Sequence, residues 1–336
     1  MRNNTPMISI LIAARNEENN ISKCLTAILG QKFPAEEYEV WIGDDNSSDS
    51  TASIVRNFQL NHKNLHLLQI KKKINGLLGK ANVLAQLAEA ANGKIFLITD
   101  ADVQVTKTWI KTYSDCFTDG VDMASGVVAL NCDSVFAQLQ NADWLNYMAH
   151  CYRKSNKGQP VTAIGCNMAI RASTYKAIGG YENVPFSITE DYELFKVVVA
   201  SGYSFKNLFN YEILAFTNPV DTFKALLRQR RRWLTGSFRK NWRFVLGFNM
   251  NCLFLPFLLA LFLINPLVSL SILAIRWIKN IYFLNIAYRT LKIKSNIGIL
   301  LYTPYEIICS FIFLFFQFLP SPVEWKGRKY PIKLND

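Results

Sequence analysis

The chain has 336 residues, a formal net charge of +12 and a hydrophobic content of 50%. An apolar content this high excludes an intrinsically disordered chain, because such chains lack the apolar surface that offsets the entropy lost on folding. The length allows one large domain or two ordinary ones, and the basic excess indicates an anionic partner, which could be nucleic acid, a phosphorylated substrate or an acidic membrane face.

Short apolar runs alternate with helical patterns over the first 240 residues. The apolar runs are bounded by turn residues and are predicted as strands at 8–13, 38–43, 65–70 and 94–99. Apolar residues at helical spacing lie between them, at 18–29, 50–59 and 79–91. This alternation predicts an α/β fold with a mostly parallel sheet covered by helices on both faces. Ligands bind such sheets at the carboxyl ends of the strands, so we expect the site there.

Polar clusters follow the first two predicted strands. The first cluster reads AARNEE at 13–18, and the second reads DDNSSD at 44–49. A cluster of this kind is often an ordinary turn or helix cap, and Ser48 or Asp49 is expected to cap the next helix. Asp45, the second of two adjacent acids, could instead accept hydrogen bonds from a base or sugar.

The fourth predicted strand ends in Asp100-Ala101-Asp102. Two carboxylates at the mouth of a sheet suit a divalent cation that bridges to a diphosphate, because hard cations such as Mg²⁺ take carboxylate and phosphate oxygen. A capping turn is the alternative interpretation of this DxD pattern. Lys80 could add positive charge near the phosphates, and its alternative is a solvated surface lysine.

A second acidic motif is Thr189-Glu190-Asp191, which precedes a predicted helix at 192–200. Acids in the first turn of a helix commonly complement the helix macrodipole. The functional interpretation makes Asp191 a general base, which must lie within hydrogen-bond reach of the proton that it removes.

A basic segment at 222–239, rich in helix formers, contains Gln229-Arg230-Arg231-Arg232-Trp233. Gln229, Arg232 and Trp233 fall within about one helical turn and could form one surface. Arg232 could clamp a leaving phosphate, and Trp233 offers a flat face to a sugar ring. Binding of anionic lipid headgroups is the alternative role for this basic run.

Two long apolar runs lie in the last third of the chain. Residues 253–275 carry no charge, and residues 297–319 carry only Glu306. About 20 apolar residues suffice to cross the hydrocarbon core, so we expect membrane contact, with a buried core helix as the alternative. Pro256 and Asn265-Pro266 interrupt the first run, which could be two helices that turn within or near the bilayer. Residues 276–296 are interpreted as a basic loop, and the topology is left open.

The cysteines and histidines do not predict a metal site. The seven cysteines are scattered without a CxxC pair, and the three histidines show no ligand spacing. This pattern favours reduced core cysteines in a cytosolic domain over disulfides or zinc. The polar start of the chain runs directly into a predicted strand, so no secretory signal peptide is expected.

Taken together, the motifs resemble those of the family 2 glycosyltransferases, in particular the membrane-attached, synthase-like members with the GT-A fold. The resemblance extends from residue 8 to about residue 233 and rests on the order of four features: the Asp-Asp strand end, the DxD, the TED and the Q-x-x-R-W. The ordered set is far more specific than any one motif. The sequence VEWKGRKY at 323–330 is similar to the tails of bacterial members with C-terminal membrane helices.

The resemblance implies an inverting transfer of a sugar from a UDP- or GDP-sugar to a lipid, lipid-linked or glycan acceptor, at the cytoplasmic face of the cell (inner) membrane. It implies Mg²⁺ or Mn²⁺ as cofactor, held by Asp102. The implied donor-binding residues are Ala13, Arg15, Glu17, Asp45, Lys80, Asp100 and Asp102. Asp191 would deprotonate the acceptor hydroxyl, and the residues implied for acceptor and diphosphate are Glu190, Gln229, Arg232 and Trp233.

The expected organisation is a catalytic domain at 1–240, a membrane-associated helical region at 241–322 and a basic tail at 323–336. Processive synthases of the family usually carry more membrane helices than the two apolar segments seen here, which favours single transfer over polymerisation. A non-catalytic, membrane-docked nucleotide-binding module is the alternative from another class. Nucleic-acid binding is disfavoured, because the basic residues concentrate near the apolar runs and no nucleic-acid motif occurs.

Overall fold

The computed structural model describes residues 7–74, 76–118, 120–185, 187–237, 250–316, 323–325 and 328–330. The chain divides into two compact units. The first unit comprises residues 1–129 and 148–218, and the second comprises residues 130–147 and 219–336. The predicted limits of the catalytic domain and of the membrane region, at residues 240 and 322, lie outside the described residues and stay predictions.

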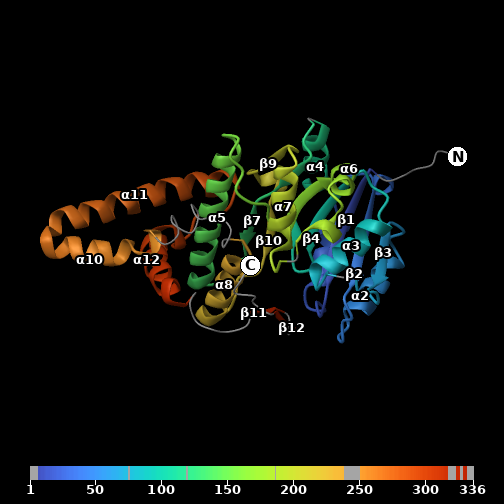
Figure 1. The fold of residues 1–336 in the computed structure, drawn as a ribbon, viewed down its shortest axis with the longest axis horizontal. Coiled ribbons are helices and arrows are strands. Elements are labelled where there is room, and N and C mark those ends of the chain that lie inside the picture. The colour runs from blue at the N-terminus through green and yellow to red at the C-terminus, as the bar shows by residue number, and fades with distance from the viewer. Residues whose placement is uncertain are drawn as a thin grey trace. The chain divides into compact units, whose positions relative to one another are not determined.

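A seven-stranded sheet forms the centre of the first unit (Figure 1), in the order β3-β2-β1-β4-β8-β6-β9. Its strands are β1 (Ile8–Ala14), β2 (Tyr38–Asp44), β3 (Leu65–Gln69), β4 (Ile95–Asp100), β6 (Met123–Ser125), β8 (Asn167–Arg171) and β9 (Phe205–Asn207). The first four strands are parallel, and β8 runs antiparallel to both β4 and β6. The prediction of a mostly parallel sheet is confirmed, and the four predicted strands end within one residue of those observed.

The register brings the polar ends of three strands to one edge of this sheet. Ala13 of β1 pairs with Gly43 of β2 on one side and with Asp100 of β4 on the other. Parallel strands that end at the same level present their following loops together. The polar cluster after β1, the cluster after β2 and the DxD therefore share one edge, as the sequence predicts.

Helices flank the sheet because its strands are apolar on both faces, and the neighbours Ile10 and Leu11, which point to opposite faces of β1, are both buried. The helices of the first unit are α1 (Ile21–Leu29), α2 (Thr51–Gln59), α3 (Lys80–Ala90), α4 (Trp109–Thr118), α6 (Ala172–Ala177) and α7 (Glu190–Ala200). At Gly43 an added Cβ would lie 2.3 Å from a methyl carbon of Val83. This glycine is what allows α3 to pack so closely on β2.

A smaller sheet of three strands has the order β5-β10-β7. Its strands are β5 (Gln104–Val105), β7 (Val128–Leu130) and β10 (Ala215–Thr217). Because β5 begins two residues after the DxD and Phe216 pairs with Gln104, Thr217 lies beside the start of β5. The small sheet thus brings a distant threonine to the DxD.

The second unit is helical in its described part. It contains α8 (Phe223–Ser237), α10 (Phe254–Ile264), α11 (Pro266–Thr290), α12 (Gly298–Phe316) and the first thirteen residues of α5 (Val135–Ser155), together with the short strands β11 (Val323–Trp325) and β12 (Arg328–Tyr330). The prediction that the first apolar run forms two helices is confirmed. They meet at Asn265, whose Oδ1 accepts the N–H of Val268 at 3.2 Å and caps α11.

The predicted basic loop at 276–296 is wrong over most of its length. Helix α11 continues through Arg276 and ends only at Thr290. The segment holds neither proline nor glycine, and charged side chains on the surface of a helix do not interrupt it. Among the described residues, α11 and α12 are long and apolar enough to cross a membrane by length and composition.

Candidate active site

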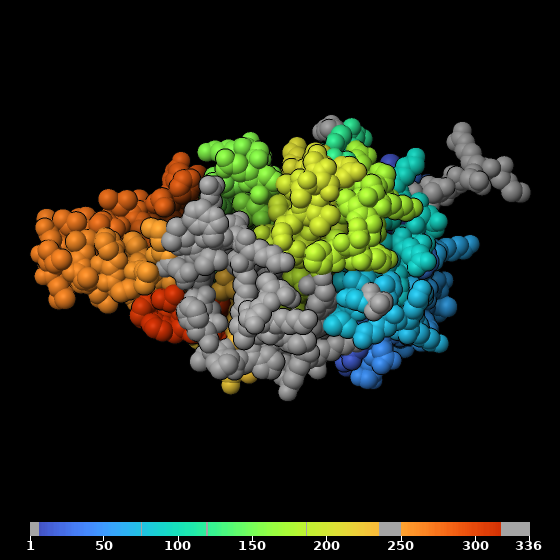
Figure 2. Space-filling view, in the orientation of Figure 1, coloured from blue at the N-terminus to red at the C-terminus, as the bar shows by residue number. Residues whose placement is uncertain are grey.

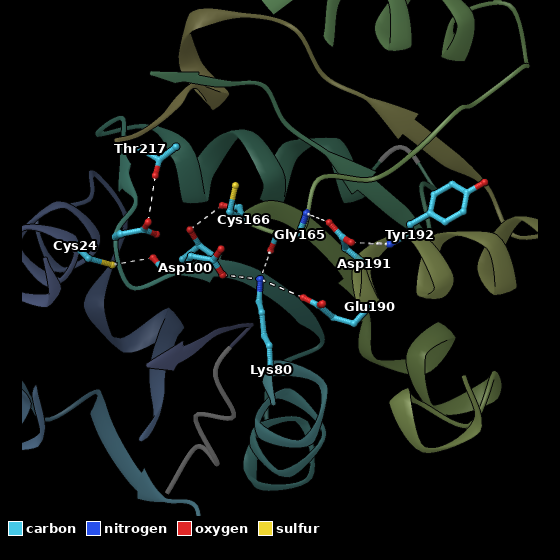
Figure 3. Close-up of polar contacts among 11 residues, drawn as sticks. Cys24, Lys80, Asp100, Gly165, Cys166, Glu190, Asp191, Tyr192 and Thr217 are labelled. Atoms are coloured by element: carbon cyan, nitrogen blue, oxygen red, sulfur yellow. Dashed lines mark hydrogen bonds and ion pairs between the residues drawn. The ribbon is translucent and has the colours of Figure 1, made fainter. Parts of the chain in front are cut away.

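The side chain of Lys80 joins the DxD to the TED motif (Figure 3). Its Nζ lies 2.5 Å from Oδ1 of Asp100 and 3.4 Å from Oε1 of Glu190, and it donates a hydrogen bond to the carbonyl of Gly165 at 3.4 Å. The Lys80 side chain is only 10% exposed. The alternative of a solvated surface lysine is therefore wrong, because this lysine is buried among acids.

The local sequence explains how a lysine comes to lie there. Gly79 has a φ of 56° and a ψ of −132°, a conformation that glycine adopts without steric cost. Helix α3 begins at the next residue, Lys80. Burial alone lowers the pKa of Lys80, but the negative charges of Asp100 and Glu190 outweigh it and hold that pKa above its ordinary value. Lys80 is a permanent cation.

Asp102 is the second carboxylate of the DxD. Its Oδ2 accepts a hydrogen bond from Oγ1 of Thr217 at 3.4 Å. Burial, followed by the negative charge of Asp100, raises the pKa of Asp102 to about 6. The two acids are thus close enough to repel each other, and Lys80 already pairs with Asp100. Lys80 forms its ion pairs with Asp100 and Glu190 rather than with Asp102.

The donor chemistry of the DxD fits a hard divalent cation. Among the described residues, no group of three or more His, Cys, Asp or Glu side chains could hold a metal unaided. Two carboxylates that leave the remaining positions to phosphate and water are the usual arrangement for Mg²⁺ with a phosphorylated substrate. Burial, and after it the charge of Asp100, raise the pKa of Asp102, and a bound cation would favour its charged form against both effects.

Asp191 lies in the first turn of α7 and is held by two backbone N–H groups (Figure 3). Its Oδ2 accepts the N–H of Gly165 at 2.7 Å, and its Oδ1 accepts the N–H of Tyr192 at 2.8 Å. At Gly165 an added Cβ would lie 2.7 Å from Oδ2 of Asp191. Only a residue without a side chain permits this approach.

Glu190 begins α7 and faces Lys80 rather than solvent. Burial raises the pKa of Glu190; Lys80 opposes this effect, and the charge of Asp191 adds to it. The TED motif is therefore more than a pair of exposed acids that complement the helix dipole. Glu190 is an ion-pair partner of Lys80 in the same cluster as Asp191.

The segment 164–167 was missed in the sequence analysis, although it connects the cluster. Cys166 accepts a hydrogen bond at its carbonyl from Oγ1 of Thr99 at 2.8 Å, while Gly165 contacts both Lys80 and Asp191. A signal existed, because Gly165 lies within the mainly apolar run 161–170, and a glycine in such a run often marks a bulge or a close backbone approach. Thr217 carried no such signal, since a single threonine in an apolar stretch predicts no role.

The residues implied for the nucleotide base lie at the ends of β1 and β2. Nη1 of Arg15 donates to the backbone carbonyl of Asp45 at 2.7 Å, and the Asp45 N–H donates to the carbonyl of Ala14 at 2.9 Å. Ala13, near the end of β1, pairs with Gly43 of β2. Glu17 is buried, and its N–H donates to Oγ1 of Thr51 at 2.8 Å. The structure brings these residues together, and their role in binding a base stays a prediction.

The residue that caps α2 is Ser50, so the expected cap at Ser48 or Asp49 is wrong. Asp49 nevertheless accepts the N–H of Thr51, the first residue of α2, at 3.0 Å and the Thr51 hydroxyl at 2.5 Å. The acid cluster at 44–49 thus includes a turn that starts this helix.

The Q-x-x-R-W residues lie on α8, in the second unit. The Trp233 ring stacks on Trp144 with centroids 4.8 Å apart, and the Arg230 guanidinium lies 5.1 Å from the Trp233 centroid. Arg230 also forms an ion pair with Asp143. The predicted approach of Gln229, Arg232 and Trp233 to the diphosphate stays a prediction.

Comparison with known proteins gives a family and a set of relatives. The sequence model of glycosyl transferase family 21 matches residues 1–336. The chain is 27% identical over 243 residues to the beta-monoglucosyldiacylglycerol synthase of Trichormus variabilis, which covers 71% of this chain and 51% of that protein. It is 26% identical over 242 residues to the poly-beta-1,6-N-acetyl-D-glucosamine synthase of Staphylococcus epidermidis, with 68% and 54% covered. The chain spans about half the length of the first curated relatives it matches.

A solved structure shows the same fold. The mannosyltransferase PcManGT from Pyrobaculum calidifontis, in complex with GDP-Man and Mn²⁺, is similar with a TM-score of 0.56 and 22% identity, over 71% of this chain and 64% of that chain. The mostly parallel sheet flanked by helices is thus of the GT-A type, as predicted. Because the family match covers every residue, the chain belongs to glycosyl transferase family 21.

Proposed function

We propose that the protein transfers a sugar from a nucleotide-sugar donor to an acceptor hydroxyl, with inversion at the anomeric carbon. The observation that carries this proposal is the Lys80 side chain, which joins Asp100 of the DxD to Glu190 of the TED motif at the carboxyl end of β4. Residues for a phosphorylated donor and for a general base thus lie in one buried cluster. Sugar transfer requires that the donor-binding residues and the base be held in fixed relative positions, whereas binding alone does not.

At the donor end, the protein must accommodate a diphosphate leaving group. Lys80 balances the charge of Asp100 and Glu190, so an anionic donor meets less repulsion at this strand end. Asp102 would hold Mg²⁺ or Mn²⁺, which supplies positive charge to the departing diphosphate. The relative PcManGT, which was solved with GDP-Man and Mn²⁺, supports this assignment. Ala13, Arg15, Glu17 and Asp45 would bind the base of the donor.

At the acceptor end, Asp191 would act as the general base. Its two oxygens are oriented by the N–H groups of Gly165 and Tyr192, and each oxygen retains a lone pair for a further proton. The acceptor oxygen forms a bond to the anomeric carbon while the bond from that carbon to the diphosphate oxygen breaks. The hydroxyl proton passes to Asp191. Attack on the face opposite to the leaving group inverts the anomeric centre.

The acceptor proposed is a lipid, lipid-linked or glycan hydroxyl at the cytoplasmic face of the cell membrane. The apolar helices α11 and α12 and the names of the two curated relatives support this proposal, because one is a diacylglycerol glucosyltransferase and the other a polysaccharide synthase. Gln229, Arg232 and Trp233 of α8 would contact the diphosphate and the acceptor. Residues 1–240 would serve catalysis, 241–322 the membrane and 323–336 as a basic tail.

Asp191→Asn tests the base. Asparagine retains an acceptor oxygen for the Gly165 N–H and loses the bond from the Tyr192 N–H, so a melting curve checks the fold; the amide cannot take a proton at neutral pH. We expect acceptor-stimulated release of nucleoside diphosphate to fall about 10²- to 10⁴-fold, with nucleotide binding unchanged. The assay screens UDP- and GDP-sugars in detergent and follows binding by thermal shift.

The matched control for that experiment is Asp115→Asn, which changes an exposed carboxylate on α4. It should turn over at the wild-type rate. Full activity of folded Asp191→Asn would remove Asp191 as the base. Nucleotide binding without turnover in the wild-type chain, across all donors and acceptors, would favour a non-catalytic binding module.

Removal of divalent cations tests the role of Asp102. We expect turnover to be lost after treatment with EDTA and restored by Mg²⁺ or Mn²⁺. Without a cation, the Asp102 carboxylate only adds negative charge at the place where the leaving diphosphate becomes more negative. Asp102→Asn should need a higher cation concentration for half-maximal activity, while Asp115→Asn should not. Undiminished turnover in EDTA would refute the metal assignment.

A further inference from the structure

A polar cluster, formed by Asn251, Arg276, Asn280, Thr303 and Glu306, ties together the helices at the end of the second unit. The guanidinium of Arg276 donates to Oε1 of Glu306 at 2.9 Å and to Oδ1 of Asn251 at 2.6 Å. Nδ2 of Asn280 donates to Oε2 of Glu306 at 3.2 Å and to Oγ1 of Thr303 at 3.1 Å. These bonds place α11, α12 and Asn251, three residues before α10, at one common level.

Two charge-free segments extend from the polar cluster in the same direction. They are the whole of α10 at 254–264 and the first part of α11 at 266–275. Helices α11 and α12 are antiparallel, since Arg276 bonds Glu306 while Asn280 bonds Thr303. Helices α10 and α11 form a hairpin (Figure 1), joined by a hydrogen bond from Oγ of Ser269 to the carbonyl of Leu258 at 2.9 Å.

The length of these segments matches half a bilayer. Ten or eleven helical residues, at about 1.5 Å each, span about 15 to 17 Å. The hydrocarbon core of a bilayer is about 30 Å thick, so one leaflet contributes about 15 Å. The hairpin tip is strongly exposed: Leu263 is 87%, Ile264 82% and Leu267 76% accessible (Figure 2, orange). An uncharged tip of this depth fits a single leaflet.

The charges of α11 exclude a simple full crossing. A span centred on this helix would bring Arg276 and Lys279 to the middle of the bilayer. Lys279 is exposed on the helix surface, and a basic side chain at the bilayer centre costs about 2.5–3.5 kcal/mol on insertion scales. Trp277 and Tyr282 are exposed close to the same level. Tryptophan, tyrosine and lysine prefer the membrane–water interface, which is where this level then belongs.

We propose that the α10–α11 hairpin inserts into one leaflet of a lipid bilayer, with the polar cluster at the headgroup level. The proposal deepens the membrane location given under the proposed function and rests on that location, but not on the chemistry of sugar transfer. The chain enters and leaves the hairpin at the same face. Asn251 and the part of α11 after residue 275 therefore stay on one side, together with Lys279, Arg289, Lys292 and Lys294.

Depth-dependent quenching tests the insertion. Ile264→Cys, at the tip, and Lys279→Cys, at the proposed interface, are labelled with an environment-sensitive fluorophore in the full chain and bound to vesicles of anionic and neutral phospholipid. The wild-type chain, labelled in parallel, corrects for its own seven cysteines. Spin labels are placed on the lipid headgroup or deep in the acyl chain. Leu60→Cys, which replaces an exposed residue of the first unit, is the matched water-exposed control.

We expect the label on Ile264→Cys to be quenched at least twofold more by deep spin labels than by headgroup labels, and the label on Lys279→Cys to show the opposite order. The reversed pattern, with the tip at a headgroup and position 279 in the centre, would establish a full crossing and overturn the proposal. Failure of the wild-type chain to float with vesicles would overturn it together with the membrane location. Turnover in detergent would still report sugar transfer independently.

A double substitution gives a second measurement that does not depend on labels. Ile264→Asp with Leu267→Asp places two charges at the proposed tip, and we expect vesicle binding to weaken at least tenfold, with donor turnover in detergent unchanged. Unchanged vesicle binding by this variant would overturn insertion of the tip. A wild-type melting temperature shows that the variant is folded, so weaker vesicle binding cannot then be attributed to unfolding.

Discussion

The carboxylate of Asp191 owes its position to a residue that has no side chain. Gly165 donates its N–H to Oδ2 at 2.7 Å, and its carbonyl accepts from Lys80, which in turn pairs with Asp100. One backbone unit therefore links the proposed base to the DxD. The distance between the base and the hydroxyl of the sugar acceptor tolerates little error, because a shift of about 1 Å can reduce a rate 10²-fold.

Gly165→Ala should displace Asp191, because the added methyl would lie 2.7 Å from Oδ2 and 2.9 Å from Cβ of that residue. We expect kcat to fall about 10- to 100-fold with the donor KM changed less than threefold, since the three atoms nearest to the new methyl all belong to Asp191. Steady-state kinetics in detergent measures both. An equal loss in kcat/KM and donor affinity would show that the substitution disturbs the donor side instead.

Gly158→Ala controls for a general loss of stability. Gly158 has a φ of 68° with no atom near the added Cβ, so alanine strains the backbone by about 1 kcal/mol without entering the cluster. Its kcat should remain at the wild-type value. A similar fall in both variants would attribute the effect of Gly165→Ala to stability alone.

At the scale of elements, Asn167 at the start of β8 connects four parts of the first unit. Its Oδ1 accepts from Nε1 of Trp109 at 2.8 Å and from the hydroxyl of Tyr113 at 2.9 Å, both on α4. Its Nδ2 donates to the carbonyl of Val127 at 2.8 Å and to that of Ile213 at 2.9 Å. The side chain is fully buried, with two donor and two acceptor contacts satisfied.

Asn167→Asp should destabilise the first unit strongly. The aspartate cannot donate to the two carbonyls, and it buries either a charge or a proton that faces acceptors. We expect a loss of about 3 kcal/mol or more, seen as a fall of roughly 6 °C or more in the melting temperature. Asn57→Asp, on the exposed face of α2, is the control and should melt within 1–2 °C of wild type. Equal melting temperatures of the two variants would contradict the role of Asn167.

The elements also differ in how well a local pattern predicts them. Strands β1, β2, β3 and β4 were predictable within a residue because each is a short, mainly apolar run bounded by turn residues. Helix α11 was not, since Arg276 and the following lysines led to a loop prediction. Those charges lie on a helix that continues to Thr290, and only the bonds to Glu306 and Asn251 explain why Arg276 is tolerated there.

At the scale of the whole molecule, the net charge and the apolar helices make separate contributions to membrane binding. The charge of +12 attracts anionic headgroups at long range, and this attraction is screened by salt. Burial of the hairpin tip is apolar and is strengthened rather than weakened by excluded salts. Binding that rests on both should lose only part of its strength as salt rises.

Flotation with vesicles at two salt concentrations measures these contributions. We expect binding to vesicles that contain anionic lipid to weaken about tenfold or more between about 0.1 and 0.5 M NaCl, because the Debye length falls by more than half. A residual binding, equal to that on neutral vesicles, should persist at high salt. Complete release at high salt would show that charge alone holds the protein and would contradict insertion of the hairpin.

Local pattern was sufficient for the parallel sheet, the order of its polar strand ends and the apolar character of the last third of the chain. Period and composition are short-range properties, so they can be read without knowing which segments meet. The pairing of Lys80 with Asp100 and Glu190, the bond from Gly165 to Asp191 and the polar cluster around Arg276 join segments that are distant in the chain. Such contacts follow from packing, because burial forces charged and polar groups to find partners that no neighbouring residue supplies.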